Sequence, residues 1–146
     1  FATDGNDVFV SISDTIEKPP GEAGGVTALR VDDGEVVWHA PPVQDTCGGR
    51  EGCHTGQPAA MTLIPGVAFA GSLDGHLRAH ATDTGQVIWD FDTAAQFRTV
   101  NGVEGRGGSI NGPGPTVVDG MVYVVSGYGS FGFMPGNVLL AFGVED

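Results

Sequence analysis

Basic residues are scarce in this sequence: 6 Lys and Arg stand against 18 Asp and Glu, a formal net charge of −12. A protein that binds nucleic acid needs a cationic face to neutralise phosphates, so that class is disfavoured. The same shortage argues against electrostatic binding to anionic membranes. No apolar run approaches the roughly 20 residues that a transmembrane helix needs, and we expect no membrane insertion.

Charged helix formers are also few, because only 16% of the 146 residues are charged, whereas 40% are hydrophobic. The chain contains 25 glycines, and glycine is costly inside a helix. The composition therefore disfavours a helical bundle or a coiled coil. It also disfavours a disordered tail, because there is enough apolar surface to bury. The length is that of one ordinary domain, and we expect no second domain within residues 1–146.

Cysteine occurs only twice, as Cys47 and Cys53, with five residues between them. Such a pair can close a small disulfide loop, which favours an oxidising compartment and thus a periplasmic or secreted protein. Cys53-His54 ends in the way that a c-type haem attachment motif ends, although that motif has two residues between its cysteines. Zinc would need more ligands than His54 and the two cysteines supply. We predict a disulfide and leave haem attachment and zinc as alternatives.

The sequence repeats itself with an offset of 51 residues, since residues 24–40 match residues 74–90. Each copy contains an alternating strand, a turn of acidic residues and glycine, and a short strand that includes a tryptophan. A second unit, rich in Val, Phe and Tyr, recurs three times. The corresponding pairs in the first unit are Ala28 and Ala79, Gly34 and Gly85, and Trp38 and Trp89.

These units predict an all-β protein with about three four-stranded antiparallel blades of a β-propeller, at about residues 1–40, 59–91 and 115–142. The first blade is expected to lack its first strand, and the third its fourth. Three blades cannot close a ring, so we expect the chain to be the C-terminal part of a longer propeller, with the remaining blades as partners. Trp38, Trp89, Gly34 and Gly85 are predicted to dock adjacent blades.

The long connections are predicted to gather on one face of the propeller, because they alternate with short turns along the chain. The connection 92–114 is rich in glycine and carries Arg106, whose guanidinium can bind a carboxylate or quinone oxygen. Gly108 allows a close approach of the backbone, and Ser109 and Asn111 add hydrogen-bonding groups. These four residues are the candidate ligand contacts. The spacing alone supports no catalytic constellation. The long connections are 13–24, 40–58, 92–114 and 127–136.

LRAHATDTGQVIWDFDT, residues 77–93, resembles the tryptophan-docking repeat of bacterial quinoproteins. The segments GGSINGPGP and SGYG…PGNVLLAF extend this likeness, and most of residues 46–143 is similar to the C-terminal third of polyvinyl-alcohol-dehydrogenase-like proteins. The resemblance implies an eight-bladed propeller that holds pyrroloquinoline quinone (PQQ) near its axis, usually with Ca²⁺. It also implies oxidation of secondary alcohols with cytochrome c as electron acceptor.

The same resemblance implies that Cys47 and Cys53 form the family's structural or cofactor-adjacent disulfide. The resemblance does not assign the family's catalytic carboxylate and calcium ligands to positions of this sequence, so both remain unknown, and the absent blades are one place for them. Because non-catalytic propellers such as outer-membrane assembly lipoproteins share the docking repeat, a scaffold or binding module is the alternative function.

Overall fold

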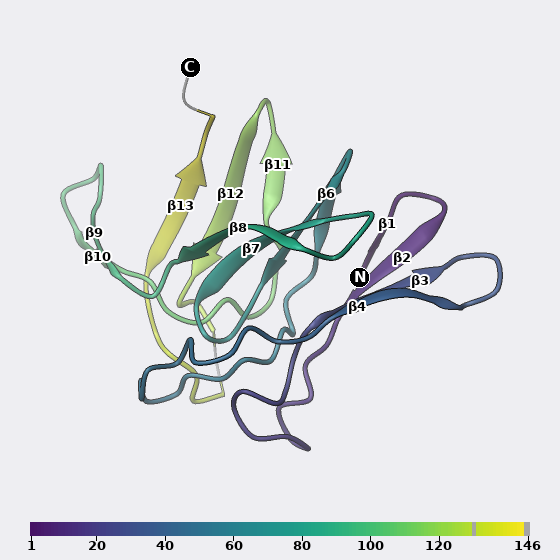
Figure 1. Cartoon of the computed structure of the whole chain (residues 1–146). Coiled ribbons are helices and arrows are strands. Elements are labelled where there is room, and N and C mark those ends of the chain that lie inside the picture. The colour runs from purple at the N-terminus through teal and green to yellow at the C-terminus, as the bar shows by residue number, and fades with distance from the viewer. Residues whose placement is uncertain (130, 145–146) are drawn as a thin grey trace.

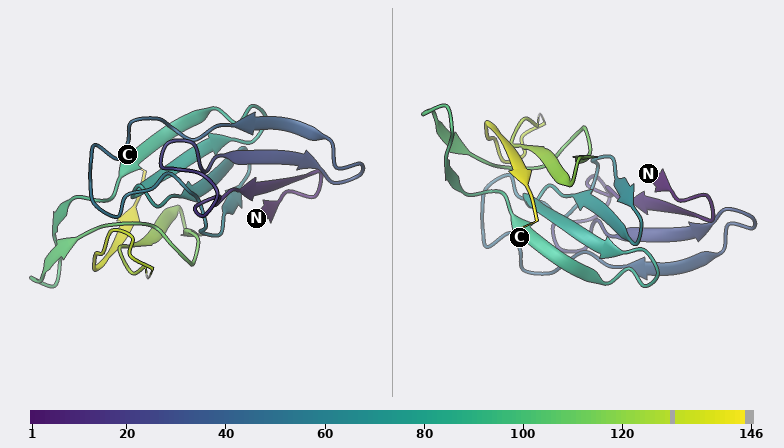
Figure 2. Two further views of the ribbon diagram at one scale, coloured as in Figure 1. Left: turned by 90° about the horizontal axis from the view of Figure 1, so that it is seen from below. Right: turned by 90° about the horizontal axis from the view of Figure 1, so that it is seen from above.

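The computed structural model describes residues 1–129 and 131–144, and every regular element in that part of the chain is a β-strand. Three antiparallel sheets stand beside one another, and their inner strands β1, β5 and β11 are neighbours (Figures 1 and 2). The predicted all-β architecture of propeller-like blades is therefore confirmed. Among the described residues we find no apolar helix of bilayer-spanning length.

Each sheet consists of strands that are consecutive in the chain, so every neighbouring pair is antiparallel. The first sheet contains β1 (Ala2–Thr3), β2 (Asp7–Ser11), β3 (Val26–Arg30) and β4 (Val36–Ala40). The second contains β5 (Thr62–Ile64), β6 (Val67–Gly71), β7 (His76–Ala81) and β8 (Val87–Asp92). The third contains β11 (Thr116–Val118), β12 (Met121–Ser126) and β13 (Val138–Phe142).

Two features differ from the expectation. The first sheet does possess an inner strand, because β1 pairs with β2 through Ala2 opposite Phe9 and Thr3 opposite Val8. Two residues are too few for a periodic pattern, so the sequence carries little signal for this strand.

The connection 92–114 is also more ordered than a glycine-rich loop, since β9 (Gln96–Arg98) and β10 (Glu104–Arg106) form a hairpin. Figure 1 shows that this hairpin projects away from the blades.

The internal repeat is visible in the backbone as well as in the sequence. The third and fourth strands shift register after Ala28 in the first sheet and after Ala79 in the second, at equivalent positions. Beyond these shifts, Gly34 and Gly85 both have φ of 73°, a left-handed conformation that favours glycine. The two blades are therefore built on one backbone plan.

Trp38 lies between the first and second sheets. Its Nε1 donates a hydrogen bond of 2.8 Å to the carbonyl oxygen of Thr82, in the turn after β7. A Cβ at Gly85 would lie 2.8 Å from two carbons of the Trp38 ring, so only glycine leaves room for it. Phe9 packs against the same indole with ring centroids 5.8 Å apart. The tryptophan of one blade thus rests on the turn of the next.

Two apolar clusters join the three sheets. The first cluster, between the first and second sheets, contains buried residues that include Phe9, Val26 and Ala68. The second lies between the second and third sheets, where Trp89 meets Phe142 edge to face with ring centroids 5.2 Å apart. The long connections gather at one end of the sheets, in the lower part of Figure 1. The packed sheets therefore act as a rigid support for these loops.

Candidate functional site

The long connections contact one another on a single face of the molecule, which we call the wide-loop face. The amide of Gln57 donates to the carbonyl oxygen of Ile12 at 2.8 Å, so the second connection lies against the first. The amide of Ser109 donates to the carbonyl oxygen of Met134 at 2.9 Å, which joins the third connection to the fourth. Loops gathered on a rigid support are a usual place for a binding site.

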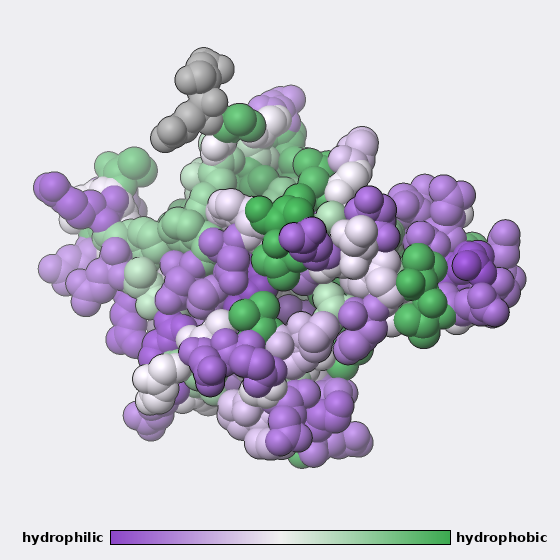
Figure 3. Space-filling model, viewed as in Figure 1, coloured by the Kyte–Doolittle hydropathy of each residue, from purple (hydrophilic) through white to green (hydrophobic). Residues whose placement is uncertain are grey.

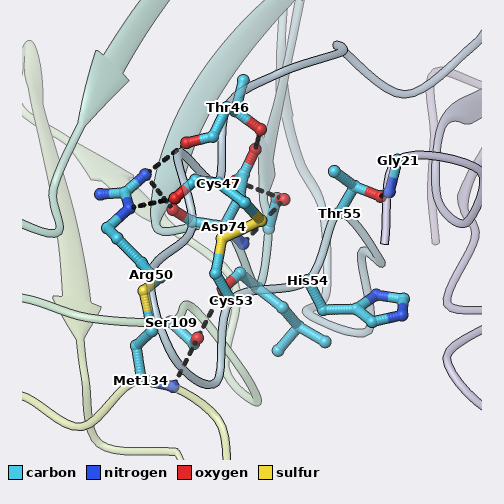
Figure 4. Close-up of a disulfide and its surroundings, with 12 residues drawn as sticks. Gly21, Thr46, Cys47, Arg50, Cys53, His54, Thr55, Asp74, Ser109 and Met134 are labelled. Carbon is cyan, nitrogen blue, oxygen red and sulfur yellow. Dashed lines mark hydrogen bonds between the residues drawn. A yellow bond between two sulfur atoms is a disulfide. The ribbon is translucent and has the colours of Figure 1, made fainter. Parts of the chain in front are cut away.

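Cys47 and Cys53 form a disulfide in the second connection, with their Cα atoms 5.5 Å apart (Figure 4). Arg50 lies within the closed loop and holds it in place. Its guanidinium donates to the carbonyl oxygens of Thr46, at 2.6 Å, and of Cys47, at 3.2 Å, and it forms an ion pair with the carboxylate of Asp92 at 3.0 Å. Because both sulfurs are bonded to each other, neither is available for a thioether link to haem.

A buried ion pair lies beneath the disulfide loop. Arg78 projects from β7 and its Nη2 lies 2.8 Å from Oδ2 of Asp74, and both side chains are almost fully buried. Thr46 Oγ1 also donates to Asp74, at 2.7 Å, which ties the disulfide loop to the second sheet. Burial opposes ionisation of Asp74, but the hydrogen bonds and charge of Arg78 outweigh it and keep the pKa below its ordinary value. The pair is therefore ionised and structural.

His80, on the same strand, is also buried. Burial lowers the pKa of His80, and the charge of Arg78 lowers it further. The hydrogen bond to the carbonyl oxygen of Gly85 and the charge of Asp90 raise the pKa, but they do not outweigh burial. His76 instead bonds Asp90 at 2.6 Å. His54 accepts a hydrogen bond from the amide of Gly56 within its own loop. Among the described residues, no group of three His, Cys, Asp or Glu side chains could hold a metal ion.

The four candidate residues of the third connection do not share one surface. Ser109 is 1% exposed, and its hydroxyl is used internally: it donates to the carbonyl oxygen of Leu73 and accepts from the amide of Met134. Gly108 is buried against Met134 and Pro135, where a Cβ would overlap backbone atoms. Gly108 and Ser109 thus hold the loop, whereas Arg106 and Asn111 each line a cavity.

The first cavity, of about 520 Å³, lies beside the β9–β10 hairpin. Arg106 and Arg50 line it together with Glu51 and the segment Gly132–Pro135. The guanidinium of Arg50 already donates to Thr46, Cys47 and Asp92. The guanidinium of Arg106 donates to no other residue in the described part of the chain, so it can meet a ligand here.

The second cavity, of about 460 Å³, lies among the ends of the three sheets on the wide-loop face. Phe133 lines both cavities and therefore separates them. We call this second cavity the Asn111 cavity. Its lining residues are Ser13, Thr15, Ile16, Pro58, Leu73, Asn111, Phe131 and Phe133.

The described residues do not form a complete site for PQQ and calcium. PQQ carries several carboxylates, and the Asn111 cavity has no cationic side chain among its lining residues. Arg106 suits one carboxylate, but it lies in the other cavity beside Glu51. The absence of a metal-binding cluster from the described residues leaves calcium without ligands here. This part of the chain can supply at most one wall of such a site.

Sequence reasoning missed several residues that the fold brings together. Ile16, Phe131 and Phe133 line the Asn111 cavity, although they belong to long connections in which no residue had been singled out. Large apolar side chains in glycine-rich connections were the available signal, because such side chains are expensive to leave in water. The Asp74–Arg78 pair had a signal too, since Arg78 stands in β7 between the apolar residues Leu77 and Ala79.

The fold and the docked tryptophans define a class: the chain forms adjoining blades of a β-propeller. The quinohemoprotein alcohol dehydrogenase of Comamonas testosteroni has the same fold, with a TM-score of 0.56 and 24% identity over 82% of this chain and 15% of that one. The chain belongs to the family described as outer membrane protein assembly factor BamB, whose model matches residues 2–137.

The chain is also similar to two enzymes over 99% of its length. It is 45% identical to the polyvinylalcohol dehydrogenase of a Pseudomonas species and 38% identical to that of Sphingopyxis sp. (strain 113P3). It spans 24% of the length of each of these relatives. Together with the fold, these similarities show that the chain is related to quinoprotein-type β-propellers.

Proposed function

We propose that this chain is part of a PQQ-dependent alcohol dehydrogenase that oxidises secondary alcohols of the polyvinyl alcohol type and passes electrons to a cytochrome c. The observation that carries the proposal is the 45% identity, over 99% of the chain, to a polyvinylalcohol dehydrogenase. The similarity includes the long connections as well as the blades. The disulfide and the similarity to polyvinylalcohol dehydrogenases favour a periplasmic or secreted location.

The proposal requires further blades, because the described residues supply only one wall of the cofactor site. PQQ, when bound, accepts the electrons of the alcohol, and the protein supplies placement and electrostatics. We assign Arg106 to a carboxylate of the quinone, since its guanidinium lines a cavity and its backbone is held by Asn137 at 2.8 Å. Asn111 is proposed as a second contact of the quinone, and Gly108 and Ser109 hold the loop between Arg106 and Asn111.

Reconstitution tests the proposal. The complete polypeptide, produced without PQQ and then given PQQ and Ca²⁺, should reduce an artificial electron-accepting dye with polyvinyl alcohol and with 2-propanol. Omitting PQQ should abolish the reaction. Loss of dye reduction in every combination would overturn the enzymatic proposal, provided that circular dichroism shows a folded β-protein.

The alternative is a non-catalytic scaffold, and the family model named after the assembly factor BamB favours it. A scaffold has no need of a cofactor. A titration of the complete polypeptide with PQQ, followed by absorbance, therefore separates the two functions: saturable binding supports the dehydrogenase, and no binding supports the scaffold.

A further inference from the structure

The Asn111 cavity is built from segments that lie far apart in the sequence. The first sheet contributes three residues from the connection after β2: Ser13, Thr15 and Ile16. In the second sheet, Pro58 precedes β5 and Leu73 lies in the turn between β6 and β7. In the third sheet, Asn111 precedes β11, and Phe131 and Phe133 lie between β12 and β13. Its volume of about 460 Å³ falls in the range of small-molecule pockets, about 300–1,000 Å³. All three sheets must therefore be packed before the cavity exists.

The lining chemistry suits a neutral aliphatic ligand that carries hydroxyl groups. Phe131 and Phe133 offer apolar surface, and the hydroxyls of Ser13 and Thr15 offer hydrogen bonds. In the part of the chain that the structure describes, the side chains of Ser13, Thr15 and Asn111 make no hydrogen bond to another residue, whereas the nearby Ser109 is fully engaged. An anion is disfavoured, because no lining residue is cationic and the chain carries a net charge of −12.

The rim of this cavity is unusually apolar. Ile16 is 98% exposed and Phe131 is 87% exposed, yet both line the cavity, one from the first sheet's loop and one from the third sheet's loop. Phe131 has φ of 70°, a conformation that is costly for a bulky residue. Exposed apolar side chains beside polar groups mark places where a ligand or a partner binds.

We propose that Ile16 and Phe131 are specificity-determining residues that hold an extended, hydroxyl-bearing aliphatic chain as it leaves the Asn111 cavity. The inference rests on the proposed function and adds to it the part of the site that distinguishes a polymer from a short alcohol. A short alcohol fits within the cavity and does not reach the rim. A polymer must cross the rim, where its methylene groups contact both side chains and lose contact with water.

The test combines Ile16→Ala and Phe131→Ala in the complete polypeptide. Loss of both apolar contacts should raise the KM for polyvinyl alcohol roughly tenfold, while kcat for the polymer and both constants for 2-propanol stay unchanged. Val100→Ala is the matched control, because Val100 is also fully exposed but lies at the tip of the β9–β10 hairpin, away from this cavity. Ile16, Phe131 and Val100 are exposed in this chain, so the wild type, the double variant and the Val100→Ala control should melt alike.

A second measurement avoids catalysis. The cofactor-free polypeptide should be retained on immobilised polyvinyl alcohol, and the double variant should lose most of this retention while Val100→Ala keeps it. Equal retention and equal KM in the double variant and the control would overturn the inference. If the complete polypeptide oxidises no alcohol but the rim variants still lose binding to the polymer, the proposed dehydrogenase falls and the polymer site stands.

Discussion

Replacing Gly85 by alanine should destabilise the protein more than the same replacement at Gly34, although the two glycines have the same φ of 73° and equivalent places in the repeat. In both variants alanine must adopt a left-handed conformation, which costs about 1–2 kcal/mol. The surroundings of the two residues differ. A Cβ at Gly34 meets no atom within 4 Å, whereas a Cβ at Gly85 overlaps the ring of Trp38.

The overlap adds the cost of overpacking, about 1–3 kcal/mol, to Gly85→Ala alone. Urea unfolding followed by far-UV circular dichroism measures both variants, and the midpoint should fall further for Gly85→Ala at an unchanged denaturant slope. In a Trp38→Ala background the methyl group has room, so the cost of Gly85→Ala should fall to that of Gly34→Ala. Equal losses in the two single variants, or a penalty that survives removal of the indole, would refute docking of Trp38 on this turn.

Three further predictions concern the disulfide loop, its buried ion pair and the cofactor contact. Replacing Cys47 and Cys53 together by alanine should cost about 2 kcal/mol of stability, because the short loop is then no longer closed in the unfolded chain. Dithiothreitol should have no further effect on the melting temperature of this variant. A variant that melts at the temperature of the wild type would contradict the prediction. Because the folded-state pKa of Asp74 is lowered, the stability it contributes is present above its unfolded pKa of 3.8 and is lost as the pH falls through the folded value. Asp74→Asn should thus be much more destabilising at pH 7 than at pH 2, whereas the exposed Asp83→Asn should have little effect at either pH, as thermal melts would reveal. Arg106→Ala should weaken PQQ binding by the complete polypeptide roughly tenfold without lowering its melting temperature. Arg98→Ala, on the same hairpin, is the control. Equal PQQ affinities of the two variants would place the cofactor elsewhere.

The blade pattern could be predicted because its causes are local. Alternation of apolar residues selects strands, and Pro65-Gly66 and Asp119-Gly120 select tight turns through the positive φ of their glycines. The repeat of 51 residues then places Trp38 of one blade against the turn at Gly85 in the next. By contrast, β1 is only two residues long and forms because β2 offers it a partner, which no local pattern reports.

The candidate site was only partly predictable, because it depends on which side chains meet across three sheets. Arg106 and Asn111 are five positions apart in one glycine-rich connection, yet the β9–β10 hairpin carries Arg106 to one cavity while Asn111 lines another. Ser109 has the composition of a ligand contact, but its hydroxyl is taken by Leu73 and Met134. Hydrogen bonding between distant segments decides such roles.

The sequence by itself therefore determined the elements: an all-β chain of repeated antiparallel units joined by short turns, with the long connections gathered on one face. These follow from side-chain periodicity and backbone preferences, which act over a few residues. Only the tertiary structure decided that Arg78 is buried against Asp74 and that Ile16 and Phe131 meet at one cavity. Ile16 and Phe131 come together only when separate sheets pack. Asp74 and Arg78 are four positions apart, but their burial depends on the distant disulfide loop, whose neighbour Thr46 bonds Asp74.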